Sequence, residues 1–344
     1  MEMKTFSIFK EIKRYFLMGM ITVLVVSCGK GVDAPDVSHI SVDVNIKPFY
    51  QDLFALDVAE LPSQFPQLED KYGSFIDAYS QKVIQIGDPK DPKYLEYLKS
   101  FLEYDANKDV LEKCNAVFKD TQHLQEELSQ AFRYLKYYFP EQKIPDIYLH
   151  ISGFNQSIVA DSAWLSISVE KYLGSDCEFY EWLSTPVYLR HKMTPEKIVP
   201  DVIKAIALTD FPGKMQNEDV ISRMIHEGKL LYFIKSMMPD IQDSLLFDYN
   251  EMQLTWCQNS EAGLWAGMVE RKHLYNSERM VIQKYVGDGP FSYYFGQESP
   301  GRAAVFLGYH IVEAYMKEHP ELTLFQLMHE MDAHKILRLS RYRP

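Results

Sequence analysis

The chain has 344 residues, a formal net charge of −12 at pH 7, and a composition that is 47% hydrophobic. Surfaces that bind nucleic acids gather Lys and Arg to neutralise phosphates, so this acidic chain is not expected to bind nucleic acid. The apolar content and length are ample for a large core or for two lobes.

The first 27 residues predict a secretory signal peptide. Four basic residues come first, and an uncharged run from Phe16 to Val26 follows them. This run of 11 residues is too short to cross a bilayer, which takes about 20 residues of helix. The alternative is an ordinary signal anchor.

The sequence VVSC at residues 25–28 resembles the lipobox of bacterial lipoproteins, in which the cysteine is lipidated and becomes the new N-terminus. We therefore predict lipidation at Cys28 and attachment to a membrane through that lipid. The segment after Cys28, GKGVDAPD, lacks a dense acidic cluster, so we expect a cell-envelope protein that faces the periplasm. Without residues 1–27 the chain keeps 32 basic and 46 acidic side chains, a net charge of −14, which argues against a polybasic membrane contact.

Residues 28–48 are predicted to be a tether with one short strand, because this stretch contains Gly, Pro, Asp and Ser and little helical periodicity. Residues 49–140 show repeated helical periodicity and predict an N-terminal helical region. The pattern changes at Pro140, after which alternating and β-branched runs between residues 144 and 170 predict a small antiparallel sheet.

Several long helices are predicted to follow the sheet. A small sheet leading into long helices, one of which has a central His-Glu pair, is the order of elements in zincin-type metallopeptidases. We therefore expect an α+β, mostly helical chain with a zincin-like domain over residues 141–344. A fold by itself does not establish a function.

The candidate catalytic motif is the sequence IHEGKLL. A zincin helix carries H-E-x-x-H, because two histidines four residues apart share a helix face and bind one zinc ion. Here His226 and Glu227 are present, but Leu230 replaces the second histidine. A lone histidine on an apolar helix is more often a hydrogen-bonded core residue than a ligand. We therefore expect neither catalytic residues nor a metal, and hence a degenerate zincin, or pseudoenzyme, without a cofactor.

The alternative is a zinc-dependent hydrolase with an atypical site. His226 and Glu261 would bind zinc, Glu227 would activate water, and a third ligand such as His273 or His310 would be recruited from elsewhere.

Lys229 suggests a replacement for the metal. Its ammonium is expected to pair with Glu227 or Glu261 in the space that a zinc ion would occupy; the simpler interpretation is a solvated lysine. His329 and His334 only resemble the missing motif, because a spacing of five residues turns their rings away from each other on a regular helix.

Small residues recur in ESPGRAAVFLGYHIV, where Gly301, Ala304 and Gly308 are spaced by three and four residues. This spacing predicts a close contact between two helices.

The lipobox and three segments, IHEGKLLYFIKSMMPD, QLTWCQNSEAGLWAGMVE and ESPGRAAVFLGYHIVEAYM, resemble gliding-motility lipoproteins of the GldB type. The resemblance implies a cell-envelope lipoprotein of the gliding machinery that works beside other motility and secretion proteins. It also implies a fold related to zinc peptidases. It supplies no catalytic residues, and the only functional position it carries over is the lipidated Cys28. The function expected is that of a protein-binding scaffold.

Overall fold

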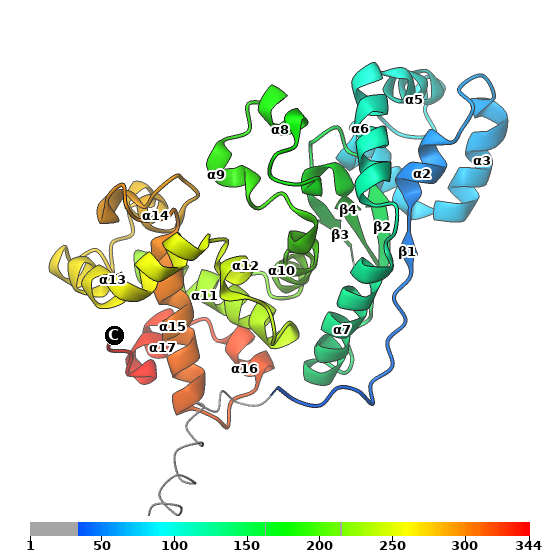
Figure 1. Ribbon diagram of the computed structural model, residues 1–344. Helices are drawn as coiled ribbons and strands as arrows, with labels where there is room; N and C mark the ends of the chain where they lie inside the picture. The colour runs from blue at the N-terminus through cyan, green and yellow to red at the C-terminus, as the bar shows by residue number, and fades with distance from the viewer. Residues whose placement is uncertain (1–33, 162, 214) are drawn as a thin grey trace, which may run out of the picture. The chain divides into compact units, whose positions relative to one another are not determined.

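The computed structural model describes residues 34–161, 163–213 and 215–344. Within these ranges it contains sixteen α-helices, α2 to α17, and a sheet of four strands (Figure 1). The fold is α+β and mostly helical, as the sequence predicted. The predicted signal peptide and Cys28 lie outside the described residues.

The sheet is mixed, so the prediction of an antiparallel sheet was wrong. Its strands lie in the order β1-β2-β4-β3, with bounds β1 Ile46–Lys47, β2 Asp146–His150, β3 Ile158–Ala160 and β4 Trp164–Ser168. Strand β2 pairs in parallel with both β1 and β4, and only the β3–β4 pair is antiparallel. All five residues of β4 are buried, which suits a central strand, whereas the half-buried β3 takes the edge. Alternation in the sequence identifies strands but does not say which strands become neighbours.

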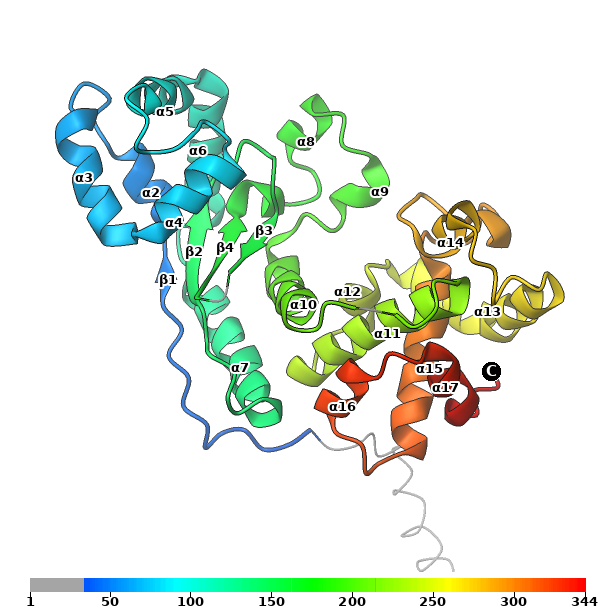
Figure 2. The same cartoon turned by 180° about the vertical axis from the view of Figure 1, so that it is seen from behind.

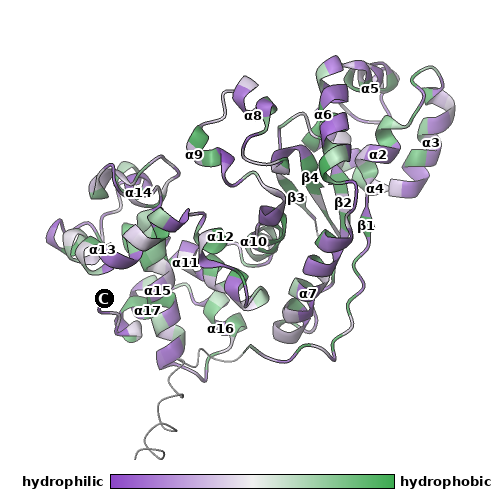
Figure 3. Ribbon diagram, viewed as in Figure 1, coloured by the Kyte–Doolittle hydropathy of each residue, from purple (hydrophilic) through white to green (hydrophobic). Residues whose placement is uncertain are grey.

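Both faces of the sheet are covered by helices. Ile147, Leu149, Leu165 and Ile167 belong to the larger apolar cluster, whereas Tyr148 and Trp164 belong to the smaller one. Strands β3 and β4 accordingly take largely the hydrophobic colour in Figure 3. Side chains on a strand alternate between faces, so one short strand serves both clusters.

The smaller cluster is built by the first helices of the chain, which pack beside β1 and β2 (Figure 2). These helices are α2 Phe49–Phe54, α3 Leu61–Tyr72, α4 Ser74–Ala78 with the π-helical turn Tyr79–Val83, and α5 Tyr94–Glu103. Their rings interlock: Phe49 meets Tyr72, Phe75 and Tyr79 edge to face at centroid distances of 4.8, 5.0 and 4.8 Å.

The larger cluster joins the other face of the sheet to the C-terminal helices. On the sheet side lie α6 Asp105–Val117, α7 Gln122–Tyr138, α8 Glu178–Trp182, α9 Val187–Arg190 and α10 Ile198–Asp210. Further along are α11 Val220–Met237, α12 Asp243–Phe247, α13 Glu251–Glu270, α14 Arg279–Val286, α15 Ala303–Glu318, α16 Leu324–His329 and α17 Ala333–Ser340. Because α10 contacts both β3 and α11, it connects the sheet to the helix that carries His226 and Glu227.

Candidate functional site

Helix α11 is fixed at its start by a side-chain cap. Asp219 accepts a hydrogen bond from the Ser222 backbone N–H at 2.9 Å, which satisfies one of the unpaired donors of the first turn. The second oxygen of Asp219 lies 2.7 Å from His334 Nε2 on α17.

Helix α11 crosses α15 at a contact between backbones. A Cβ added to Gly308 would lie 2.0 Å from the Met224 carbonyl oxygen, and one added to Gly228 would lie 2.4 Å from the Gly308 backbone. Glycine is required at both positions because no side-chain atom fits between the helices. The close contact predicted from the small residues is therefore confirmed at Gly308.

A cluster of charged side chains lies on the Glu227 side of α11. It contains four cations and four carboxylates, which we call the charged cluster: Lys192, Lys197, Asp201, Lys204, Glu227, Asp248, Asp288 and Arg302.

Arg302 is the central link of the charged cluster. Its Nη2 lies 2.8 Å from Glu227 Oε2, and its Nη1 lies 3.6 Å from Asp248 Oδ2. Lys204 Nζ approaches the same Glu227 oxygen at 3.6 Å, and Lys197 Nζ approaches Asp248 Oδ1 at 2.5 Å. The guanidinium therefore joins α11 to the end of α12.

Two members of the charged cluster have left-handed backbones. Asp248 has φ of 60° and Arg302 has φ of 61°. Residues other than glycine rarely adopt this conformation, which costs on the order of 1–3 kcal/mol where the surrounding structure enforces it. One ion pair joins the two side chains, and each also pairs with another member of the charged cluster.

The pKa values show that the carboxylates at Arg302 are held ionised. Burial alone would raise the pKa of the Glu227 carboxyl, but the nearby Lys204 and Arg302 outweigh burial and bring it below its ordinary value. For Asp248, Lys197 and Lys192 overcome burial in the same way and lower the pKa. An ionised carboxylate with a lowered pKa is a weak general base.

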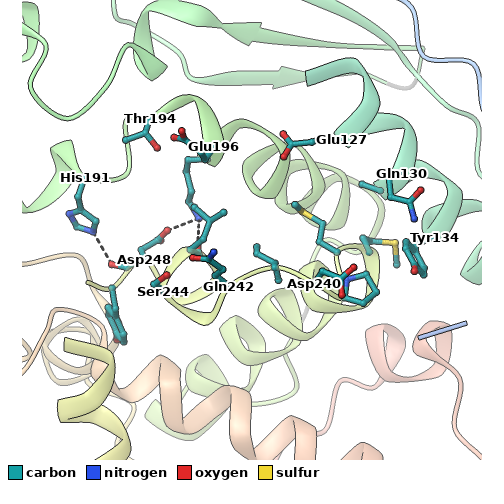
Figure 4. Close-up of a pocket in the computed structure, with 18 of the residues that line it drawn as sticks. Glu127, Gln130, Tyr134, His191, Thr194, Glu196, Asp240, Gln242, Ser244 and Asp248 are labelled. Atoms are coloured by element: carbon teal, nitrogen blue, oxygen red, sulfur yellow. Dashed lines mark hydrogen bonds and ion pairs between the residues drawn. The ribbon is translucent and has the colours of Figure 1, made fainter. Parts of the chain in front are cut away.

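A groove of about 620 Å³ opens beside the charged cluster, between α7 and the α11–α12 turn (Figure 4). Its apolar lining includes Ala131, Tyr134, Met237, Met238, Ile241 and Leu245. Glu127, Glu196 and Asp240 stand around it in Figure 4. Glu196 and Asp240 are exposed, and within the described part of the chain neither has a hydrogen bond or an ion pair. The free charge of the groove is therefore negative.

His226 lies on a different side of α11 from the Arg302 pair. Its ring packs against Gly213, where an added Cβ would be 2.2 Å from the ring. Leu230, at the position of the missing histidine, is 1% exposed and belongs to the larger apolar cluster.

The predicted ion pair of Lys229 is replaced by other contacts. Its ammonium donates to the carbonyl oxygens of Met328 at 2.9 Å and Glu330 at 2.8 Å. Within the described residues, the cations that form ion pairs with Glu227 are Arg302 and Lys204 instead. The spacing on α11 turns Lys229 toward α16, away from both predicted partners.

Glu261 on α13 is also engaged elsewhere. One of its oxygens lies 2.6 Å from His310 Nδ1 and accepts a hydrogen bond from the Tyr342 hydroxyl at 2.6 Å. Two residues of the hypothetical zinc site, Glu261 and His310, are thus brought together, but the third position considered, His273, contacts Tyr285 at 3.0 Å.

The donor set for a metal is not assembled in the described part of the chain. No group of three or more His, Cys, Asp or Glu side chains is arranged there to hold a metal ion. His329 ends α16 and His334 lies in α17, so the two do not even share a helix. The residues proposed for zinc, His226 and Glu261, do not fit a zinc site in this structure.

Sequence reasoning missed Lys197, Asp248 and Arg302. Arg302 stands in the segment ESPGRAAVFLGYH, directly before α15, and an arginine at a helix start beside small residues was the only signal. Its partners Glu227 and Asp248 are 75 and 54 positions away in the sequence, so the pattern does not reveal them.

None of the helices that the structure describes has the length and apolar character needed to span a membrane. A sequence model of the family described as gliding motility protein GldB matches residues 30–344. No curated protein and no solved structure matches the chain.

Proposed function

The chain belongs to the family of the gliding motility protein GldB, and from this premise we propose that it is a lipid-anchored envelope scaffold that binds other proteins of the gliding machinery without catalysis. The family match supports involvement in gliding motility. The scaffold role, the anchor at Cys28 and the orientation toward the periplasm are parts of the proposal.

One observation carries the scaffold role. Glu227, the only general base that the motif offers, is held by Arg302 at 2.8 Å and by Lys204 at 3.6 Å. A carboxylate in a partly buried ion pair is engaged by its partner cations, and taking a proton from water would break that pair at a cost in stability. Leu230 supplies no ligand, so the remnant of a zincin helix serves as a structural element. We retain the zincin-like relationship of the fold as part of this proposal.

The groove is the contact surface that we assign to a partner. Aliphatic, methionine and tyrosine side chains form its apolar lining, and Met237 and Met238 can adapt to different shapes. Because Glu196 and Asp240 are unpaired within the described residues, charge complementarity favours a basic segment with apolar side chains. The cations beside the groove, Lys197 and Lys192, are already paired with Asp248 and do not oppose such a segment.

Complementation of motility tests the scaffold role. In a gliding bacterium that lacks its own GldB-type protein, wild type, Glu227→Gln and Cys28→Ala are expressed, and colony spreading is compared with the amount of folded protein. We expect Glu227→Gln to glide in proportion to its folded amount and Cys28→Ala to fail after release from the membrane. Loss of gliding by a fully folded Glu227→Gln variant would contradict the scaffold.

Elemental analysis tests the metal directly. The purified protein is dialysed, and its zinc content is compared with that of His226→Ala. We expect no stoichiometric zinc in either protein. Stoichiometric zinc that is lost in His226→Ala would overturn the proposal in favour of a hydrolase.

Charge reversal tests the groove. Glu196→Lys with Asp240→Lys is expected to abolish spreading while leaving the thermal midpoint unchanged, because both side chains are exposed. The matched control is Asp70→Lys with Asp109→Lys, which reverses two exposed carboxylates outside the groove. Equal spreading by the two double variants would remove the groove from the proposal.

A further inference from the structure

A second cavity, of about 310 Å³, lies on the His226 side of α11. Ser222, Ile225, His226 and Lys229 line it from α11, at spacings of three and four residues along one helix face. The opposite wall comes from the end of α16 and the start of α17, with Met328, Ala333 and Ile336. No function described above uses this cavity.

Ser222 lies in the wall of the cavity, and its side chain is buried. The residue is 1% exposed, and its Oγ has no hydrogen-bond partner within the described part of the chain. A buried hydroxyl without a partner costs on the order of 1–3 kcal/mol, so a polar group that binds to it is favourable.

Lys229 places a second donor at the same cavity. The residue is 8% exposed, and its two hydrogen bonds to the Met328 and Glu330 carbonyl oxygens use two of the three ammonium hydrogens. Burial lowers the pKa of Lys229 to about 8, and the nearby Glu330 opposes this effect. The carboxylate of Glu330 pairs with Lys335, so among the described residues the positive charge of Lys229 has no carboxylate of its own.

Two other polar groups of the cavity, Asp210 and His226, do not oppose a hydrogen-bond acceptor on a ligand. Asp210 lies at the exposed rim and accepts a hydrogen bond from Gln142 at 2.9 Å. Burial lowers the pKa of His226, although Glu227 raises it, so its ring is neutral at pH 7 and can accept or donate. Phe211, Ile225, Met328 and Ile336 supply the apolar surface.

We infer that this cavity binds a small monocarboxylic acid, whose carboxylate accepts hydrogen bonds from Lys229 and Ser222 and whose apolar body lies against Ile225, Met328 and Ile336. The ammonium can only donate and the hydroxyl can donate as well as accept, and a carboxylate compensates a buried ammonium better than a neutral acceptor does. The space equals that of about ten water molecules, which suits a small acid and excludes a folded segment of a partner. The site does not depend on the groove or on the scaffold role.

Titration calorimetry with phenylacetate and hexanoate tests the inference on the purified protein. We expect a Kd of about 1 mM or tighter for at least one acid. Phenylacetamide and hexanamide, which lack the charge, are expected to bind about tenfold more weakly. Lys229→Met is expected to weaken binding of the acid about tenfold or more, and Ser222→Ala about threefold. Lys204→Met, on the other side of α11, is the matched control and is expected to bind like wild type.

A labelling experiment on the unmodified chain makes the test independent of how the variants fold. An amine-reactive reagent is applied near pH 8 with and without phenylacetate, and each lysine is followed by mass spectrometry. The acid is expected to slow labelling of Lys229 and to leave Lys204 unchanged. Absence of acid binding by the folded protein, equal affinity in Lys229→Met, or unprotected Lys229 at saturating acid would each overturn the inference.

Discussion

The two sides of α11 differ in how their polar groups are satisfied. On one side Glu227 meets Arg302 and Lys204 in a charged cluster of four cations and four carboxylates. On the other side, within the described residues, the Ser222 hydroxyl has no hydrogen-bond partner, and Lys229 beside a cavity uses two of its three ammonium hydrogens. One helix can therefore be a structural support on one side and a binding surface on the other.

The same difference separates the surroundings of His226 and Glu227. Neighbouring side chains on a helix point about 100° apart, so they act together only if the surrounding fold directs both toward one centre. Here α10 and the start of α15 hold Glu227, whereas His226 packs against Gly213. The tertiary contacts therefore direct the two side chains of the motif to different surroundings.

The largest predicted effect comes from removing the central cation of the charged cluster. Arg302→Met leaves Glu227 and Asp248 with fewer counter-charges, so we expect the free energy of unfolding to fall by about 3–5 kcal/mol, measured by urea denaturation. Arg341→Met is the control, because the exposed Arg341–Glu318 pair contributes at most about 0.5 kcal/mol. A loss below 1 kcal/mol in Arg302→Met would mean that this side of α11 is not the structural one.

The crossing of α11 and α15 determines the direction in which each side of α11 faces. Gly308→Ala places a Cβ 2.0 Å from the Met224 carbonyl oxygen, and the helices must move apart. We expect a loss of about 2–3 kcal/mol by the same denaturation. Gly263→Ala on α13, where nothing lies within 4 Å of an added Cβ, is expected to stabilise by about 0.5–1 kcal/mol. Equal effects at the two glycines would contradict the close crossing.

On the Lys229 side of α11, the stability at alkaline pH tests whether the ammonium is desolvated. Because the folded-state pKa of about 8 lies below the unfolded value, the unfolded chain holds the proton more tightly above pH 8. Stability relative to Lys229→Met should therefore rise with pH, by about 2 kcal/mol between pH 8 and pH 9.5. Denaturation of both proteins at a series of pH values measures the difference, and a constant difference would show that Lys229 is not desolvated.

The smallest predicted effect is the change in stability that Glu227 causes at acidic pH. The folded-state pKa of Glu227 is lowered, so its stabilisation is complete above the ordinary carboxyl pKa and is lost as the pH falls through the folded value. The stability difference between wild type and Glu227→Gln should therefore shrink from about pH 5 to about pH 3. Over this range, the stability of Lys229→Met should change with pH as the stability of wild type does. A Glu227→Gln curve parallel to wild type would contradict the ion pair.

Sequence alone determined the features that depend on local pattern. Helical periodicity indicated a mostly helical chain, the small residues indicated a close helix contact that the structure has at Gly308, and the quoted segments identified the family. The fold class could be predicted because apolar spacing is repeated in every element. Leu230 likewise indicated, without a structure, that the motif lacks its second histidine.

Only the tertiary structure decided which side chains meet. Strand β4 lies between β2 and β3 and makes the sheet mixed, although β3 precedes it in the chain. Arg302 reaches Glu227 across 75 positions, and Lys229 reaches the Glu330 carbonyl across 101 positions. A sequence pattern reports which face of an element is apolar. The partner of a buried charge depends on how the helices cross, and here that crossing is set by two glycine backbones in contact.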